Sequence, residues 1–350
     1  MSELDERIMR IRLPVALIRE MDGVIGRGVG GYMTRTEFIV DAIQERVLDL
    51  TLPREEDGGP PPGHTTRKVP KYPTDAAELS EVKETSVDIS MTALPAPAQG
   101  SAVEGSEEYS RPEGRPLFGL HNRDYPSLWA LSKLADLTTA GPIALEAYFA
   151  EVCEQAWKFG ELLLEIERRV GGKRTALFPT NREKKKAAEA GFQAFAIGGY
   201  RSGPNGVVFT SGPLFEWRVA GLTTNDGAAL LVGVTPAGRA LLEAIAGMTI
   251  EEPRPADVSA PFLAHLARHA PADWSGFVAI IRAVGSTGGT RQDVLDHVAK
   301  TWPDWTRSEV STNAAGYIAR AREWGLVEPK QTRSKYHLTS LGLHQANGAQ

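Results

Sequence analysis

The chain has 350 residues, of which 42% are hydrophobic and 24% are charged, as in ordinary globular proteins. It has no apolar run near the roughly 18 residues that a membrane span needs and no signal-peptide core, so the sequence predicts a cytoplasmic protein of two or three domains. Because Cys153 is the one cysteine, an internal disulfide and a cysteine-based zinc site are excluded.

The formal net charge of −5 comes from one segment, residues 53–115, which holds twelve acidic side chains and seven basic ones. The same segment contains Gly-Gly-Pro-Pro-Pro-Gly at 58–63, further prolines and few aromatic residues. Such a composition buries too little apolar surface to offset chain entropy, so we expect a disordered acidic linker over 53–115. The rest of the chain is balanced in charge, and the overall acidity does not argue against a nucleic-acid partner.

The segment before the linker, residues 1–52, begins with alternating apolar and polar side chains over 8–13, which indicate a strand that ends at Pro14. A helix, a glycine-rich turn and a second helix follow, the last opened by a capping box of Thr34 and Glu37. A single strand has no pairing partner in so short a module, and about 45 residues bury too little surface to be stable alone. The pattern therefore predicts a dimer in which the strands of two chains pair.

Two motifs in this module resemble a known family. Arg10-Ile11-Arg12-Leu13-Pro14 resembles the strand ending of the ribbon-helix-helix (MetJ/Arc-type) repressors, and residues 31–39, Gly-Tyr-Met-Thr-Arg-Thr-Glu-Phe-Ile, resemble the opening of their second helix. The resemblance implies that the paired strands enter the major groove of DNA. It further implies that base edges are read by Ile8, Arg10 and Arg12, and that a phosphate is held by the helix start at Thr34, Arg35 and Thr36. The alternative is an amphipathic edge strand with solvated arginines.

The larger body begins near residue 116 with two predicted helices. Tyr125–Leu137 is the first, and residues 141–172 form a longer one in which apolar side chains recur in steps of four and three. This seam fits a central core helix of one domain and a dimeric coiled coil equally well. Cys153, beside the seam, is interpreted as a small buried side chain.

The end of the body contains an internal repeat of helix, strand, polar turn, strand and Thr-capped helix. The closing helix is capped by Thr235 in one copy and by Thr339 in the other. Before the second copy we expect three helices, over Ser275–Val284, Arg291–Thr301 and Thr306–Trp324. The first copy is less complete, with strands expected at Phe192–Ile197 and Val207–Thr210 and a third helix shortened by Pro213.

This pattern resembles the closing half of a winged helix-turn-helix domain, which implies that the third helix enters the major groove and the wing touches the DNA backbone. By position it nominates as DNA-contacting residues Thr306, Arg307, Ser308, Ser311, Asn313 and Arg320 on the helix, and Lys330, Arg333 and Lys335 on the wing. The alternative is a protein-binding surface, because Asp304 and Glu309 dilute the basic face.

Signatures of catalysis are weak. The chain has no Walker loop, no nucleophile elbow and no His-Glu-x-x-His motif, so we expect no catalytic residue, no cofactor and no metal site. His265 and His269 lie four residues apart, as helical metal ligands would. Without nearby cysteines they are interpreted as packing or surface histidines.

The sequence as a whole predicts a mainly α protein with small β elements (α+β). Its expected parts are a ribbon-helix-helix domain at 1–52, the linker at 53–115, a helical winged-helix-like domain at 116–250, a connector at 251–271 and a winged helix at 272–346. We expect a homodimeric, sequence-specific transcriptional regulator that binds double-stranded DNA, associated with the nucleoid. The alternatives are an adaptor or assembly protein of the partition, defence or antitoxin kind, whose body recruits a protein partner, and an enzyme domain within 116–250.

Overall fold

The computed structural model describes residues 89–348 apart from 101, 104–109, 118–122, 171–176, 181–184, 204–206, 225–228 and 333, together with Ile18 and Ile39. The predicted ribbon-helix-helix domain and the first part of the predicted linker lie outside the described residues, except that Ile18 and Ile39 are helical. In the part that is described, the fold is mainly helical with small sheets, which confirms the α+β class.

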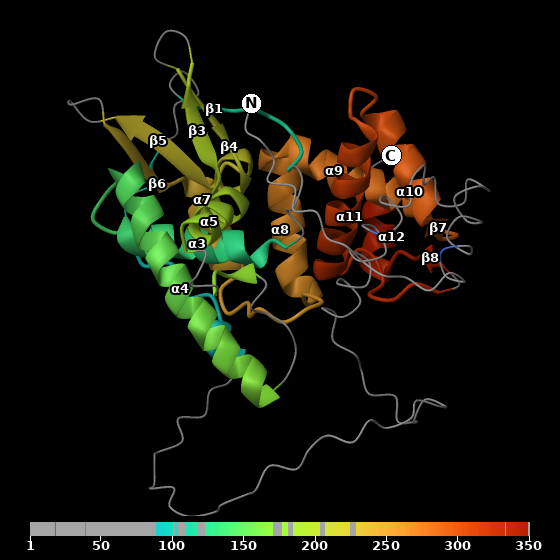
Figure 1. The fold of residues 1–350 in the computed structure, drawn as a ribbon, viewed down its shortest axis with the longest axis horizontal. Coiled ribbons are helices and arrows are strands. Elements are labelled where there is room, and N and C mark those ends of the chain that lie inside the picture. The colour runs from blue at the N-terminus through green and yellow to red at the C-terminus, as the bar shows by residue number, and fades with distance from the viewer. Residues whose placement is uncertain are drawn as a thin grey trace, which may run out of the picture.

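A first unit, residues 125–244, combines helices with a three-stranded sheet of order β2-β6-β5 (Figure 1). Strands β5 and β6 form an antiparallel hairpin, and the short β2 pairs antiparallel with the second hairpin strand, β6. Between its second helix and this hairpin the unit carries an insertion, described below. The elements shared with the second unit are α3 (Tyr125–Leu137), β2 (Ile143–Ala144), α4 (Leu145–Val170), β5 (Ala220–Thr224), β6 (Leu230–Val234) and α7 (Pro236–Ala244).

A second unit, residues 271–348, has the same order, except that a long helix precedes its hairpin where the first unit has only the short helix that ends its insertion. The short strand after its first helix, β7, pairs antiparallel with β8, and an isolated bridge between Val327 and Leu338 closes the hairpin. In both units the strand that follows the first helix thus pairs with the returning arm of the hairpin. The elements are α9 (Pro271–Val284), β7 (Gly289–Thr290), α10 (Arg291–Thr301), α11 (Arg307–Glu323), β8 (Lys335–Tyr336) and α12 (Ser340–Gly348).

The last helix of each unit starts with the same cap. The Thr235 hydroxyl accepts a hydrogen bond from the Gly238 N–H at 3.0 Å, and the Thr339 hydroxyl accepts one from the Gly342 N–H at 3.0 Å. Threonine suits this position because its oxygen satisfies an N–H group that has no partner within the helix. The structure therefore confirms the internal repeat and its two threonine caps.

Glycine three residues after each threonine is required by close packing. A Cβ at Gly238 would lie 2.2 Å from the carbonyl oxygen of Val219, and one at Gly342 would lie 2.1 Å from that of Leu326. These contacts press each closing helix onto the start of its hairpin. The Thr-x-x-Gly pattern is thus a packing signature that both units share.

The insertion in the first unit corrects one prediction. Residues Phe192–Ile197, expected as a strand, are helical: α5 (Lys185–Phe192) continues into the π-helix η5 (Gln193–Ile197). Phe192 and Ala196, four residues apart, are both buried, and η5 packs on α3, which favours a helix over a strand. The two other predictions for this insertion are confirmed. β4 (Val208–Ser211) is a strand, and α6 (Pro213–Glu216) is a helix of only four residues.

β4 lies in a second three-stranded sheet, paired antiparallel with β3 (Gly199–Ser202) and parallel with β1 (Ser110–Pro112). β1 belongs to the segment predicted as a linker, and other parts of that segment are also structured. Ile89–Thr92 forms the 3-10 helix η2, Leu94 is 2% exposed, and the Val103 N–H donates to the Val234 carbonyl at 2.8 Å. The prediction of disorder is therefore wrong for the described residues between 89 and 115, because apolar side chains such as Leu94 and Val103 pack on a surface that composition does not reveal.

The predicted connector, residues 251–271, contains a helix of the core, α8 (Ala256–His269). Figure 1 shows α8 between the first unit and the helices of the second. Phe262, Leu263 and Leu266 are buried along it at the spacing of one helix face. The two units are therefore joined by a shared buried helix rather than by a simple tether.

The heptad seam of α4 is buried within a single chain. Leu145, Val152, Ala156 and Leu163 are at most 1% exposed. This supports the core-helix alternative, because the seam needs no second chain to cover it. Among the helices that the structure describes, none is long and apolar enough to cross a membrane.

Candidate nucleic-acid interface

The start of α11 presents polar side chains to solvent. Thr306 caps the helix through a capping box, in which the Glu309 N–H donates to the Thr306 hydroxyl at 3.3 Å and the Thr306 N–H donates to the Glu309 carboxylate at 2.7 Å. Arg307 and Ser308 are exposed and Ser311 is half-buried. The structure therefore leaves the first turns of this helix accessible, as a helix that enters a DNA groove must be.

The hairpin that follows α11 carries two exposed lysines, Lys330 and Lys335. Its tip is tied by two backbone hydrogen bonds between Thr332 and Lys335, of 3.0 and 3.1 Å. Arg333, the third wing residue nominated by the sequence, lies outside the described residues. The hairpin thus holds two ammonium groups near a tight turn, where a phosphate backbone could approach them.

Two residues nominated on α11 are wrong as DNA contacts. Asn313 is 2% exposed and Arg320 is 0% exposed. Both lie on the helix face of Tyr317, which is buried, since 313, 317 and 320 follow each other in steps of four and three. Because Asn313 and Arg320 are polar, they were expected on the surface, but their helical spacing places them in the interior.

Arg320 instead connects the two units. Its Nε donates to Asp124 at 2.8 Å, and its Nη1 and Nη2 donate to the two carboxylate oxygens of Asp273 at 2.8 and 2.7 Å. Asp124 precedes α3 in the first unit and Asp273 lies in the first turn of α9 in the second. Burial would raise the pKa of Asp273, but the Arg320 guanidinium and the hydrogen bonds of Tyr317 and Trp217 lower it to about 2. Both aspartates are therefore hydrogen-bonded to one buried arginine.

Two tryptophans make crossed hydrogen bonds at the same junction. Trp217 of the first unit donates from Nε1 to Asp273 of the second at 2.9 Å, and Trp324 of the second unit donates to Asp124 of the first at 2.6 Å. Phe262 of α8 lies between them, stacked on Trp324 with ring centroids 3.9 Å apart and edge-on to Trp217 at 5.3 Å. Each unit thus donates a tryptophan hydrogen bond to an aspartate at the start of the other, on either side of Phe262.

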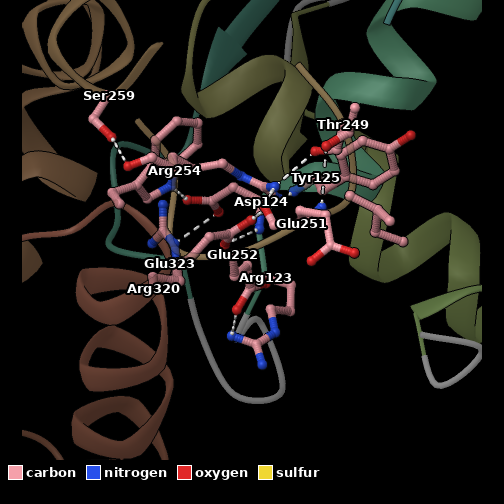
Figure 2. Close-up of polar contacts among 12 residues, drawn as sticks. Arg123, Asp124, Tyr125, Thr249, Glu251, Glu252, Arg254, Ser259, Arg320 and Glu323 are labelled. Atoms are coloured by element: carbon pink, nitrogen blue, oxygen red, sulfur yellow. Dashed lines mark hydrogen bonds and ion pairs between the residues drawn. The ribbon is translucent and has the colours of Figure 1, made fainter. Parts of the chain in front are cut away.

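Figure 2 shows how Glu323 and Arg254 complete the junction. The Glu323 carboxylate accepts hydrogen bonds from the backbone N–H groups of Asp124, at 2.8 Å, and Tyr125, at 3.3 Å, which caps the start of α3 from the other unit. Arg254 donates to Glu323 at 2.9 Å and to the carbonyl of Thr249 at 2.7 Å. Because these charged groups are buried and bound to one another, they fix the orientation of one unit relative to the other.

The repeat carries a signal for this junction that the sequence analysis missed. Glu216-Trp217 and Glu323-Trp324 are the same dipeptide, placed directly before the hairpin in each copy. Trp217 lies 18 residues before Thr235 and Trp324 lies 15 residues before Thr339, so the two copies align at tryptophan when the first hairpin is allowed three more residues. Asp124 and Asp273 have no comparable signal, because their partners are 200 and 56 residues away in the chain.

The pair His265 and His269 behaves as the sequence suggested. His265 is buried and its Nε2 lies 2.8 Å from the Trp217 carbonyl oxygen, and burial lowers its pKa to about 4. It is a packing histidine. Among the described residues, no group of three histidine, cysteine or carboxylate side chains could hold a metal ion.

The residues nominated for base and phosphate contact in the N-terminal module lie outside the described part of the chain: Ile8, Arg10, Arg12, Thr34, Arg35 and Thr36. Comparison with known proteins adds no family assignment, since no protein-family model, curated protein or solved structure matches this chain.

Proposed function

We propose that the two units are winged helices and that the chain is a homodimeric DNA-binding regulator. One observation carries this proposal for the body: the exposed start of α11, with Arg307 and Ser308, is followed directly by a hairpin with exposed Lys330 and Lys335. These are the two elements with which winged helices touch DNA. The order of elements, with the first short strand paired to the returning hairpin arm, supports the same assignment.

The two units have different parts in this proposal. The helix before the hairpin of the first unit, α6, has four residues, and Leu214, Phe215 and Glu216 on it are buried. It is too short and too enclosed to enter a groove. We therefore assign DNA contact to the second unit and support of that unit to the first.

Sequence-specific reading is assigned to the paired ribbons of residues 1–52, on the resemblance to ribbon-helix-helix repressors. We expect Arg10→Ala and Arg12→Ala each to weaken binding to the specific site by about 1–3 kcal/mol, because each arginine can bind guanine O6 and N7 together. Fluorescence anisotropy on the specific duplex, selected beforehand from a random library with the natural chain, measures the loss. A random duplex measured in parallel gives the sequence-independent part.

The matched control is Met9→Leu, which alters the opposite face of the same strand and keeps it apolar. Its specific affinity should change by less than the arginine variants. An equal loss for Arg10→Ala on specific and random duplexes would show phosphate contact only, and a monomeric natural chain in light scattering would contradict the paired ribbon.

Contact by the second unit is tested through salt dependence. Each phosphate neutralised by a side chain adds about 0.9 to the slope of log K against log salt. Replacing Arg307, Lys330 and Lys335 together by alanine should flatten this slope by up to about three units per protomer. Specificity should change little, since phosphate contacts carry no sequence information. Measuring this in a chain that also carries Arg10→Ala and Arg12→Ala isolates the contribution of the body.

Lys158→Ala with Lys186→Ala is the control for that experiment, because both lysines are exposed on helices of the first unit. Their slope should equal that of the natural chain. An unchanged slope in the triple variant would favour the adaptor alternative, in which the second unit binds a protein. The adaptor alternative is supported by Asp304 and Glu328, which are exposed and lie close in sequence to Arg307 and Lys330.

A further inference from the structure

Glu216 is a buried carboxylate at the place where the two units meet. It is the last residue of α6 and is 6% exposed. Its Oε2 accepts a hydrogen bond from the Gly114 N–H at 3.2 Å. The next residue, Trp217, donates to Asp273 of the second unit at 2.9 Å, so that aspartate lies close by. Within the described part of the chain, no arginine, lysine or histidine forms an ion pair with Glu216.

The equivalent residue of the second unit, Glu323, is held differently. It is 0% exposed, accepts hydrogen bonds from two backbone N–H groups and forms an ion pair with Arg254 at 2.9 Å (Figure 2). A buried carboxylate without a cation is unfavourable, because its charge has lost the solvation of water. The same position of the repeat therefore has a counter-charge in the second unit and, among the described residues, none in the first.

The charged groups that act most strongly on Glu216 are both acidic. They are Asp273 of α9 and Glu113, which precedes α3. Each already binds an arginine, since Asp273 accepts from Arg320 at 2.7 Å and Glu113 accepts from Arg201 at 3.1 Å. An ionised Glu216 therefore adds a third negative charge to a place where two carboxylates already hold their own cations.

The elements packed on α6 offer no further charge that would favour an ionised Glu216. Its neighbours η5, β4 and β5 contain no charged residue. The charged or titratable groups on the other surrounding elements are bound to another group, neutral or exposed. They are Lys133 with Asp136 and Asp124 with Arg320 at α3, His265 on α8, Arg218 with its charge acting on His269, and exposed Arg115.

Burial raises the pKa of Glu216 from its ordinary value of 4.5 to about 7. The Gly114 N–H lowers it, and the negative charge of Asp273 raises it further. In the folded chain the carboxyl group can hold its proton on Oε1 and still accept from Gly114 through Oε2. The stability that this proton provides is fully present below about pH 4.5 and is lost as the pH rises through about 7.

The segment Ser110–Leu117, called the strap below, crosses from one unit to the other over this carboxyl group. Its start is β1, which pairs with β4 of the first unit, and its middle is bound to Glu216 through the Gly114 N–H. At its end the Leu117 N–H donates to the Tyr317 hydroxyl of α11 at 3.0 Å. The strap thus connects the inserted sheet of the first unit to the inner side of α11.

We propose that Glu216 is a proton-dependent switch, which holds the strap against the junction when its carboxyl group is protonated and releases it when the group is ionised. An ionised carboxylate is stabilised by water, so it favours an open arrangement in which Gly114 no longer covers it. Opening also withdraws Leu117 from Tyr317, so α11 is held less firmly at high pH. This switch goes beyond the proposed DNA binding, and its test needs no DNA.

The experiment is hydrogen exchange on the full chain at pH 5.5 and pH 8, read on peptides that contain Gly114 and Leu117 and corrected for the intrinsic effect of pH on exchange. The opening equilibrium of the strap should rise at least about tenfold between the two conditions, because it changes about tenfold per pH unit between the pKa values of the open and closed states. Glu216→Gln resembles the protonated form. Its strap should be protected equally at both pH values, and at pH 8 at least about tenfold better than in the natural chain.

Glu243→Gln is the matched control, because Glu243 is an exposed glutamate of α7 in the same unit. Its strap should open with pH as in the natural chain. Glu323→Gln is the contrasting variant and should weaken protection at the start of α3 at both pH values, since Arg254 loses its counter-charge.

The natural chain alone can overturn the proposal, whatever the variants do: equal protection of its strap at pH 5.5 and pH 8 would exclude the switch. The proposal is also overturned if the strap of Glu216→Gln opens at pH 8 as readily as that of the natural chain. A loss of the pH effect in Glu243→Gln as complete as in Glu216→Gln would assign the effect to overall charge and not to this buried group.

Discussion

Replacing Arg320 by methionine is expected to lower the free energy of unfolding by about 3–5 kcal/mol, because it leaves two buried carboxylates without their counter-charge. Asp124 and Asp273 are both fully enclosed, and Asp273 loses two hydrogen bonds at once. Urea denaturation followed by tryptophan fluorescence measures the loss. Trp217 and Trp324 report directly, since each donates to one of these aspartates.

Arg307→Met is the control for this variant, because Arg307 is an exposed arginine of the same helix. It should change stability by no more than about 0.5 kcal/mol. Arg320→Lys should fall between the two, since an ammonium keeps the charge but cannot reproduce the paired guanidinium contacts. Equal stability of Arg320→Met and Arg307→Met would contradict the buried cluster.

Phe262→Ala is the second variant with a large expected effect, about 3–5 kcal/mol, because the ring is fully buried and in contact with aromatic groups of both units. Its loss leaves a cavity between Trp217 and Trp324, at the centre of the junction. We therefore expect the two units to become less coupled as well as less stable. Hydrogen exchange should show weaker protection of amides in both α3 and α11.

Phe192→Ala provides the comparison for Phe262→Ala. Phe192 is also buried, but it packs against Trp129 and Phe178, within the first unit. Replacing Phe192 should weaken the protection of amides in α3, and the amides of α11 should stay better protected than in Phe262→Ala. Equal loss in α11 for the two variants would show that α8 has no special part in joining the units.

The junction matters for the proposed function because it orients the exposed turn of α11. Arg320 and Tyr317 are held from the inner side by Asp273, while Arg307 projects at the start of the same helix. Binding energy at Arg307 is therefore not spent on ordering the helix.

Local pattern determined much of the fold in advance. Helical periodicity placed α3 at Tyr125–Leu137 and α10 at Arg291–Thr301 with their observed bounds. The Thr-x-x-Gly caps at Thr235 and Thr339 identified the repeat, since capping depends on residues that are close in sequence. The segment around Phe192–Ile197 was misjudged because a short apolar run fits a strand or a buried helix equally well.

The sequence by itself determined the class of the fold, the repeat, and the exposed polar start of α11. Only the tertiary structure decided that Arg320 is a buried link and that Leu94 and Val103 belong to the body. The physical reason is the same in each case: periodicity and capping act between residues a few positions apart, whereas burial is set by surfaces that meet across the chain. Arg320 and Asp124 are 196 residues apart, and no local pattern records that their charges meet.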